Sequence, residues 1–290
     1  ITSVQVAGDL VDGEIQADGM LPNVKISGDA IHDSLIQGAT GGTVAIAGNL
    51  SEGVVSFSGD AGSIKVGGSV LGKDGGIYVG NNVLNITVKG GVFGGDSDKI
   101  SVNGTAALVS IGASVHNATL EFDTLTSIKI GGSIMDSLIY GETSIGTVSI
   151  GRSTYESGIV SDGGMGAVTV KGTVFQSTIS AVGSVAKLTA SEFFDSDIII
   201  GGNLGLVTAT AGDIDPDTII DVGGDLAGIK AAGLLAGPVI VDGNLTGSIL
   251  SAGNEALEYG GFHYFTDANG MTTGGVLVVA GTIAPGVVIS

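Results

Sequence analysis

A seven-residue pattern that recurs about every twenty residues is the feature that most constrains the fold of this chain. Its first and third positions are apolar in all ten copies, and its second position is mostly polar, as in VQVAGDL, VKISGDA and VAIAGNL. Alternation with a period of two is typical of a β-strand with one buried face. A register kept over ten copies indicates a coil in which each unit stacks on the unit before it. The copies begin at Val4, Val24, Val44, Ile64, Ile86, Val109, Ile128, Val148, Val168 and Leu188.

The later positions of the pattern indicate a bend and a second strand. The fifth position is Gly in seven of ten copies, mostly followed by Asp, Asn, Ser or Thr, which suits a bend in the backbone. The seventh position is apolar in nine copies, Phe194 among them, and Thr154 is the exception. Seven residues after the fifth position another apolar residue occurs in eight copies, for example Leu35 and Ile199. Each unit therefore contains at least two short strands.

After residue 192 the pattern persists in half-length steps, with copies at Ile198, Ile220, Ile229, Val239 and Leu277. Successive sides of the coil are therefore expected to carry the same sequence pattern. We predict an all-β fold, a single-stranded parallel β-solenoid with about 20 residues per rung and roughly 14 rungs. A β-sandwich, the main alternative, would not keep this register over ten copies. The pattern divides the chain into a β-solenoid at 1–256, an inserted Gly-flanked aromatic loop at 257–274 and a terminal solenoid rung at 275–290.

Composition and charge argue against several kinds of partner. The formal net charge is −19 and Arg152 is the only arginine, whereas nucleic-acid phosphates need clustered cations. No stretch reaches the roughly 18 apolar residues that a membrane helix needs, so we expect no membrane span. The chain has no cysteine, which removes disulfides and thiolate catalysis. Its start at Ile1 is what a processed secreted protein or an excised fragment would show, and we expect an extracellular or cell-surface location.

Catalysis finds little support in the sequence. The three histidines, His32, His116 and His263, have no repeated relation to a serine or an acid. Polysaccharide lyases and hydrolases with β-helix folds generally combine acids with several basic residues, and this chain has one arginine. We therefore expect a protein that is not an enzyme and that needs no cofactor.

Four aspartates in the stretch DIDPDTIID form the candidate metal site: Asp213, Asp215, Asp217 and Asp221. Alternating carboxylates are the ligands that a hard cation such as Ca²⁺ prefers. The spacing departs from an EF-hand loop, because Thr218 stands where the turn glycine belongs. A solvated acidic loop is the alternative interpretation.

The stretch EYGGFHYFTDANG, residues 258–270, interrupts the repeat. The copies at Val239 and Leu277 are 38 residues apart where ten or twenty would be in register, so about eighteen residues, roughly 257–274, leave the coil. Protruding aromatic side chains suit an interface with a partner. They also suit a cap that folds back over the last rungs, or stacking on carbohydrate. The candidate interface residues are Tyr259, Phe262, His263, Tyr264 and Phe265.

The VxIxGDL units resemble the Gly-rich β-helical repeats of large bacterial and archaeal surface or secreted proteins, adhesin-like ones included. More weakly, they resemble bactofilins, which are polymer-forming β-solenoids. The resemblance implies the solenoid fold and self-assembly. Neither end of the repeat offers an amphipathic helix or a charged segment that would block a terminal rung.

We therefore expect a structural subunit of an extracellular or cell-surface assembly, polymerising head to tail with copies of itself through uncapped solenoid ends. The alternative is an adhesin-like rod module that presents a loop for a surface glycan or another partner.

Overall fold

The computed structural model describes residues 2–95, 98–252, 255–259, 262–266 and 272–289. This part of the chain forms strands and no helix, and the protein is a parallel β-solenoid of about twelve turns, as predicted. Its contacts divide it into two compact units, residues 1–145 and 146–290, which are described separately.

Among the described residues of the first unit, sixteen strands are complete, and β17 (Leu138–Ile150) has residues in both units. The strands of the first unit are β1 (Val4–Val6), β2 (Leu10–Val11), β3 (Glu14–Ile26), β4 (Ala30–Ile31), β5 (Leu35–Ile46), β6 (Leu50–Ser51), β7 (Val54–Phe57), β8 (Ala61–Val66), β9 (Val70–Leu71), β10 (Gly76–Val79), β11 (Val83–Val88), β12 (Val92–Phe93), β13 (Asp98–Ile111), β14 (Val115–His116), β15 (Thr119–Ile130) and β16 (Ile134–Met135).

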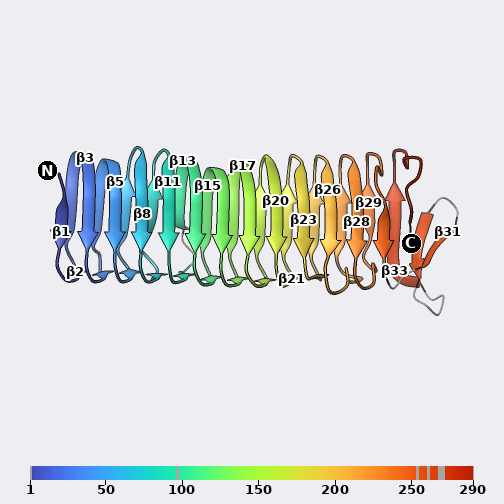
Figure 1. Ribbon diagram of the computed structural model, residues 1–290, viewed down its shortest axis with the longest axis horizontal. Coiled ribbons are helices and arrows are strands. Elements are labelled where there is room, and N and C mark those ends of the chain that lie inside the picture. Colours follow the sequence, from blue (N-terminus) through green and yellow to red (C-terminus); the bar gives the residue numbers. More distant parts are fainter. Residues whose placement is uncertain (1, 96–97, 253–254, 260–261, 267–271, 290) are drawn as a thin grey trace. The chain divides into compact units, whose positions relative to one another are not determined.

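Each turn of the first unit contributes to three columns of parallel strands. The first column holds the predicted pattern and runs from β1 through the second half of β3 and β5 to β8 and β11, which Figure 1 shows side by side. The second column holds the two-residue strands, from β2 and β4 onward. The third holds the first half of β3 and β5, then β7 and β10. Longer strands such as β3 therefore serve two columns.

The alternation of the pattern places its apolar positions in the core. Val44 and Ile64 pair in register in the first column, and both are buried. Between the apolar positions, Lys25, Ala45 and Lys65 pair successively and form the outward column that the second position predicts. Small Ala45 separates the two lysines, which keeps like charges off adjacent strands.

The glycine at the fifth position is required by a close approach between turns. A Cβ on Gly48 would lie 1.9 Å from Oδ1 of Asp29, and a Cβ on Gly28 would lie 1.9 Å from Oδ1 of Asp9. These oxygens accept hydrogen bonds from backbone N–H groups one turn later, as Asp9 Oδ1 does from the N–H of Asp29 at 2.8 Å. The bend is as predicted, but the glycine makes room for this ladder of side-chain oxygens, and Gly28 and Gly48 do not have positive φ.

The second unit continues the same construction. Its strands are β18 (Thr154–Tyr155), β19 (Gly158–Ser161), β20 (Gly164–Val170), β21 (Thr173–Phe175), β22 (Thr178–Ala181), β23 (Val185–Ala190), β24 (Glu192–Phe194), β25 (Asp197–Ile200), β26 (Leu204–Ala209), β27 (Ile219–Val222), β28 (Leu226–Ala231), β29 (Val239–Val241), β30 (Ile249–Ser251), β31 (Glu255–Tyr259), β32 (Phe262–Thr266) and β33 (Thr272–Val279).

The half-length steps in the sequence reflect similar first and third columns. The copies at Ile198, Ile220, Val239 and Leu277 lie in the third column, as parts of β25, β27, β29 and β33. The copy at Ile229 lies in the first column, where β28 pairs with β26 and β30. Both sides of the coil therefore carry the same pattern, as the sequence indicates.

Two local assignments from the repeat are wrong because the copy at Leu188 runs one residue short. The structure pairs Leu188 with Val207, a turn of nineteen residues. Phe193, and not Phe194, faces the core, and Ile198, and not Ile199, does so in the next strand. Phe194 is 41% exposed and Ile199 is 45% exposed.

The turn count is about twelve where roughly fourteen were expected. Several turns are longer than twenty residues. Val66, Val88 and Ile111 pair in succession at separations of 22 and 23 residues, and Val207 pairs with Ile229 at a separation of 22. Between Val241 of β29 and Val279 of β33, strands β30, β31 and β32 intervene, so a further stretch of chain adds no parallel turn to the third column.

Candidate functional site

The N-terminal edge of the first unit leaves one side of a parallel strand open. β1 pairs with β3, from Val4 opposite Val24 to Val6 opposite Ile26, and no other described strand pairs with β1. Val4 and Val6 are half-buried, whereas Val24 and Ile26, one turn later, are at most 2% exposed. Within the described chain, β1 is therefore paired on one side only, and its apolar side chains are less buried than their partners in β3.

The C-terminal edge of the third column is arranged differently. Leu277 of β33 is paired on both sides, in parallel with Val239 of β29 and antiparallel with His263 of β32. β31 and β32 form an antiparallel pair from Glu255 opposite Thr266 to Tyr259 opposite Phe262. The hairpin of β31 and β32 therefore covers the edge of β33 through backbone pairing.

The candidate aromatic interface lies on this hairpin. The structure places Tyr259 at the end of β31 and the other four candidates in β32. The side chains of Tyr259, Phe262, His263, Tyr264 and Phe265 lie outside the described residues, so their role as an interface stays a prediction.

The candidate calcium ligands are not brought together. Asp213 Oδ1 accepts a hydrogen bond from the N–H of Leu234 at 2.7 Å. Asp215 is buried, and its Oδ1 accepts from the N–H of Asp195 at 3.0 Å and from Thr218 Oγ1 at 2.6 Å. The other two candidates, Asp217 and Asp221, lie in an exposed turn and in β27. Within the described ranges, no three carboxylates or histidines are grouped so that they could hold a metal ion.

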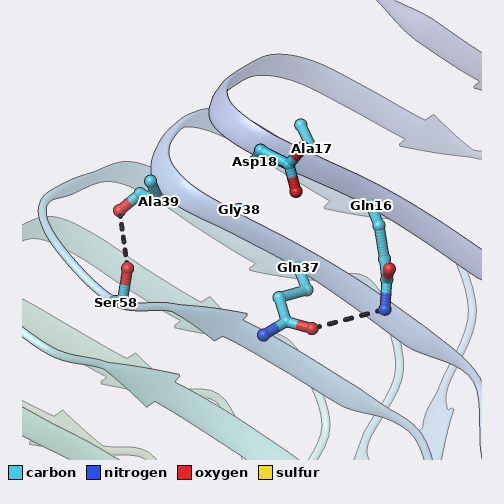
Figure 2. Close-up of a pocket in the computed structure, with 7 residues that line it drawn as sticks. All are labelled: Gln16, Ala17, Asp18, Gln37, Gly38, Ala39 and Ser58. Carbon is cyan, nitrogen blue, oxygen red and sulfur yellow. Dashed lines mark hydrogen bonds between the residues drawn. The ribbon is translucent and has the colours of Figure 1, made fainter.

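A hollow of about 210 Å³ lies in the first unit, between β3, β5 and the end of β7, and Figure 2 shows seven residues that line it. Gln16 Nε2 donates to Gln37 Oε1 at 3.4 Å, and Ser58 Oγ donates to the carbonyl oxygen of Ala39 at 3.5 Å. Asp18 supplies the one carboxylate among the lining residues. General acid–base chemistry uses positioned proton donors and acceptors with matched pKa values. A lone carboxylate beside two amides suits hydrogen bonding to a polar ligand better than proton transfer.

The buried cation of the first unit has a structural role. Lys99 is fully buried, and its Nζ donates to the carbonyl oxygens of Lys73 and Gly75. Burial lowers the pKa of Lys99, and the negative charge of Asp74 partly opposes that shift. Lys99 therefore fastens the loop between β9 and β10.

Three aromatic rings form a column on the outer side of the second column of the second unit. Tyr155 of β18 pairs with Phe175 of β21, which pairs with Phe194 of β24. The ring centroids of Tyr155 and Phe175 are 6.0 Å apart, and those of Phe175 and Phe194 are 5.2 Å apart with planes within 8° of parallel. Tyr155 and Phe194 are each 41% exposed. We call Tyr155, Phe175 and Phe194 the aromatic ladder.

Sequence reasoning missed the aromatic ladder although a signal was present. Aromatic residues recur at 155, 175 and 194, spacings of twenty and nineteen residues that match the repeat. The seven-residue pattern ends before Tyr155 and Phe175, and it takes Phe194 for a core residue. A search for exposed residue types at the repeat spacing would have found the ladder.

A row of polar residues borders the aromatic ladder. Glu156, Gln176 and Asp195 directly follow the three rings, are exposed, and have left-handed backbone with φ of 47°, 46° and 46°. Gln176 Nε2 donates to Asp195 Oδ2 at 2.8 Å. We call Glu156, Gln176 and Asp195 the polar rim.

Buried serines hold the corners that carry the polar rim. The serine after each rim residue donates its hydroxyl to the carbonyl oxygen of the ladder residue two positions earlier, at 2.6, 2.7 and 2.8 Å. These serines are Ser157, Ser177 and Ser196. The corner is thus fixed by the chain itself, and the ladder and rim are set side by side before any ligand binds.

Among the described residues, no helix has the length and apolar character needed to cross a membrane. Comparison with known proteins found no matching family model, no matching curated protein and no matching solved structure.

Proposed function

We propose that the protein is a structural β-solenoid subunit that assembles head to tail, in an extracellular or cell-surface setting. The open edge of β1 carries the proposal, because an unpaired parallel strand accepts another strand in register. A turn supplied by a second copy would pair with β1 and cover Val4 and Val6. Such a contact joins unlike surfaces of two copies and can therefore be repeated.

The hairpin of β31 and β32 bears on how far assembly proceeds. Its strand β32 already occupies the edge of β33 that a second copy would extend in the third column. Addition at this edge must displace β32 or build on β31. We therefore expect the hairpin to limit the length of assemblies.

The test follows the size of assemblies of the 290-residue chain by sedimentation velocity and electron microscopy. Val4→Lys together with Val6→Lys places two charges in the open edge and should abolish concentration-dependent assembly. Gln5→Glu is the matched control, since Gln5 is exposed and pairs with Lys25, so a charge added on the same strand faces outward and meets an opposite charge. Monomers of the unaltered chain at every concentration would refute the proposal.

A second candidate function is a binding rod, similar to an adhesin module, that presents a site to a partner. The exposed aromatic ladder favours it, because apolar patches on a protein surface often mark interaction sites.

A further inference from the structure

The aromatic ladder of the second unit is more apolar than its position in the fold requires. The residues just before the rings, Thr154, Val174 and Phe193, point inward and are at most 1% exposed, so they fill the core at this corner. The ladder residues point outward. Rings stacked on adjacent strands gain some stability from one another. Tyr155 and Phe194 nevertheless remain 41% exposed, so a ligand can contact them.

The polar rim defines the chemistry beside this apolar track. Glu156 and Asp195 make no ion pair with a described residue, and ionised carboxylates only accept hydrogen bonds. Gln176 uses its amide nitrogen on Asp195 and keeps its carbonyl oxygen available. The rim therefore offers acceptors, and its complement is a ligand that carries several hydrogen-bond donors next to apolar C–H surface.

Charge and shape further restrict the class of ligand that suits the ladder and the rim. The chain carries a formal net charge of −19 and the rim itself is acidic, so polyanions are repelled. The same repulsion opposes a second copy lying against the ladder. Small molecules bind in concave sites. The ladder follows the outer face of three adjacent strands, which is a track and not a pocket, so it suits a polymer.

We propose that the aromatic ladder and the polar rim bind a neutral polysaccharide strand. The C–H surfaces of its sugar rings contact Tyr155, Phe175 and Phe194. Its hydroxyl groups donate to Glu156, to Asp195 and to the carbonyl oxygen of Gln176. This site is separate from the surfaces of head-to-tail assembly, because the ladder and the rim include no residue of β1 or of β31, β32 and β33.

The test is affinity electrophoresis of the 290-residue chain through gels that contain mixed-linkage β-glucan, xylan or mannan, with polygalacturonate as the acidic counterpart. At least one neutral polymer should retard the unaltered chain. Replacing the ladder by Tyr155→Ser, Phe175→Ser and Phe194→Ser should weaken that binding at least tenfold. The matched control carries Ile199→Ser, Ile219→Ser and Ile240→Ser, which alter three exposed apolar residues on other strands of the same unit and should leave retardation unchanged.

Far-UV circular dichroism on heating checks that both triple variants remain folded. If the ladder variant unfolds, Glu156→Ala with Asp195→Ala replaces it, and that pair should also weaken binding. The proposal is overturned if no neutral polymer retards the chain, if polygalacturonate binds as well as the neutral polymers, or if retardation persists without the ladder. It is also overturned if the ladder variant changes the sedimenting mass while no polymer binds, since the ladder would then contact a second copy.

Discussion

Gly48 and Asp29 provide the sharpest test of why the repeat contains glycine. In Gly48→Ala the new Cβ would lie 1.9 Å from Asp29 Oδ1, so the carboxylate must move. Movement breaks the hydrogen bond from the N–H of Asn49 to Asp29 Oδ1. A partly buried N–H without a partner costs about 2 kcal/mol. Gly48 does not have positive φ, so its backbone conformation suits alanine, and the remaining close contact of the Cβ is with the carbonyl carbon of Gly28 at 3.1 Å.

Asp29→Ala breaks the same hydrogen bond directly and should also cost about 2 kcal/mol. The double variant loses that bond once, so its free energy of unfolding should fall by about 2 kcal/mol, and not by the additive ~4 kcal/mol. Urea unfolding followed by far-UV circular dichroism measures all four proteins, with the slope m compared to establish that they unfold alike. A double variant destabilised by ~4 kcal/mol would show that the two residues act independently, and would refute the argument that the side-chain ladder selects glycine.

Two further predictions concern buried groups. Phe193→Ala removes a fully buried ring and should lower the free energy of unfolding by about 3–5 kcal/mol. Phe194→Ala removes an exposed ring with one stacked neighbour and should lower the free energy of unfolding by about 1 kcal/mol. Urea unfolding midpoints in the opposite order would contradict the assignment of Phe193 to the core. Burial lowers the pKa of Lys99 below its ordinary 10.5. Just below pH 10.5 the unfolded chain therefore binds more protons than the folded chain. The free energy of unfolding should consequently rise with pH in that window. The Lys99→Met variant should lack this rise. If the free energy of unfolding depends on pH identically in the variant and in the unaltered chain, the prediction for Lys99 is contradicted.

The repeat made the fold predictable because the same physical constraint acts at every turn. Val24, Val44 and Ile64 each face a residue of the same kind above and below, so one pattern fixes strand direction, register and core together. The outward column of Lys25, Ala45 and Lys65 follows from the same alternation. Turn length was less predictable, since a residue can be gained or lost at a corner without disturbing the strands on either side.

The candidate sites were harder to predict because a side chain's partner lies a whole turn away. Asp213 and Asp215 look like free carboxylates in sequence, yet each accepts backbone hydrogen bonds from an adjoining turn. The aromatic ladder depends on Phe194 and not Phe193 pointing outward, which one missing residue decides. The fold follows from the residue types that most copies of the repeat share. A site depends on single residues that differ from the repeat pattern, such as Phe194.

The ladder of side-chain oxygens has a consequence for how a chain of this kind can change in length. Asp9 Oδ1 meets the N–H of Asp29, and Asp29 Oδ1 meets the N–H of Asn49, so each turn presents the next with the same acceptor in the same place. Removing residues 28–47 would set Gly48 above Gly8, and the N–H of Asn49 would face Asp9 Oδ1. A whole turn is therefore interchangeable with its neighbours, because duplication or loss of about twenty residues keeps the same kinds of contact between adjacent turns. A shift of one residue within a strand, in contrast, would turn its core side chains outward.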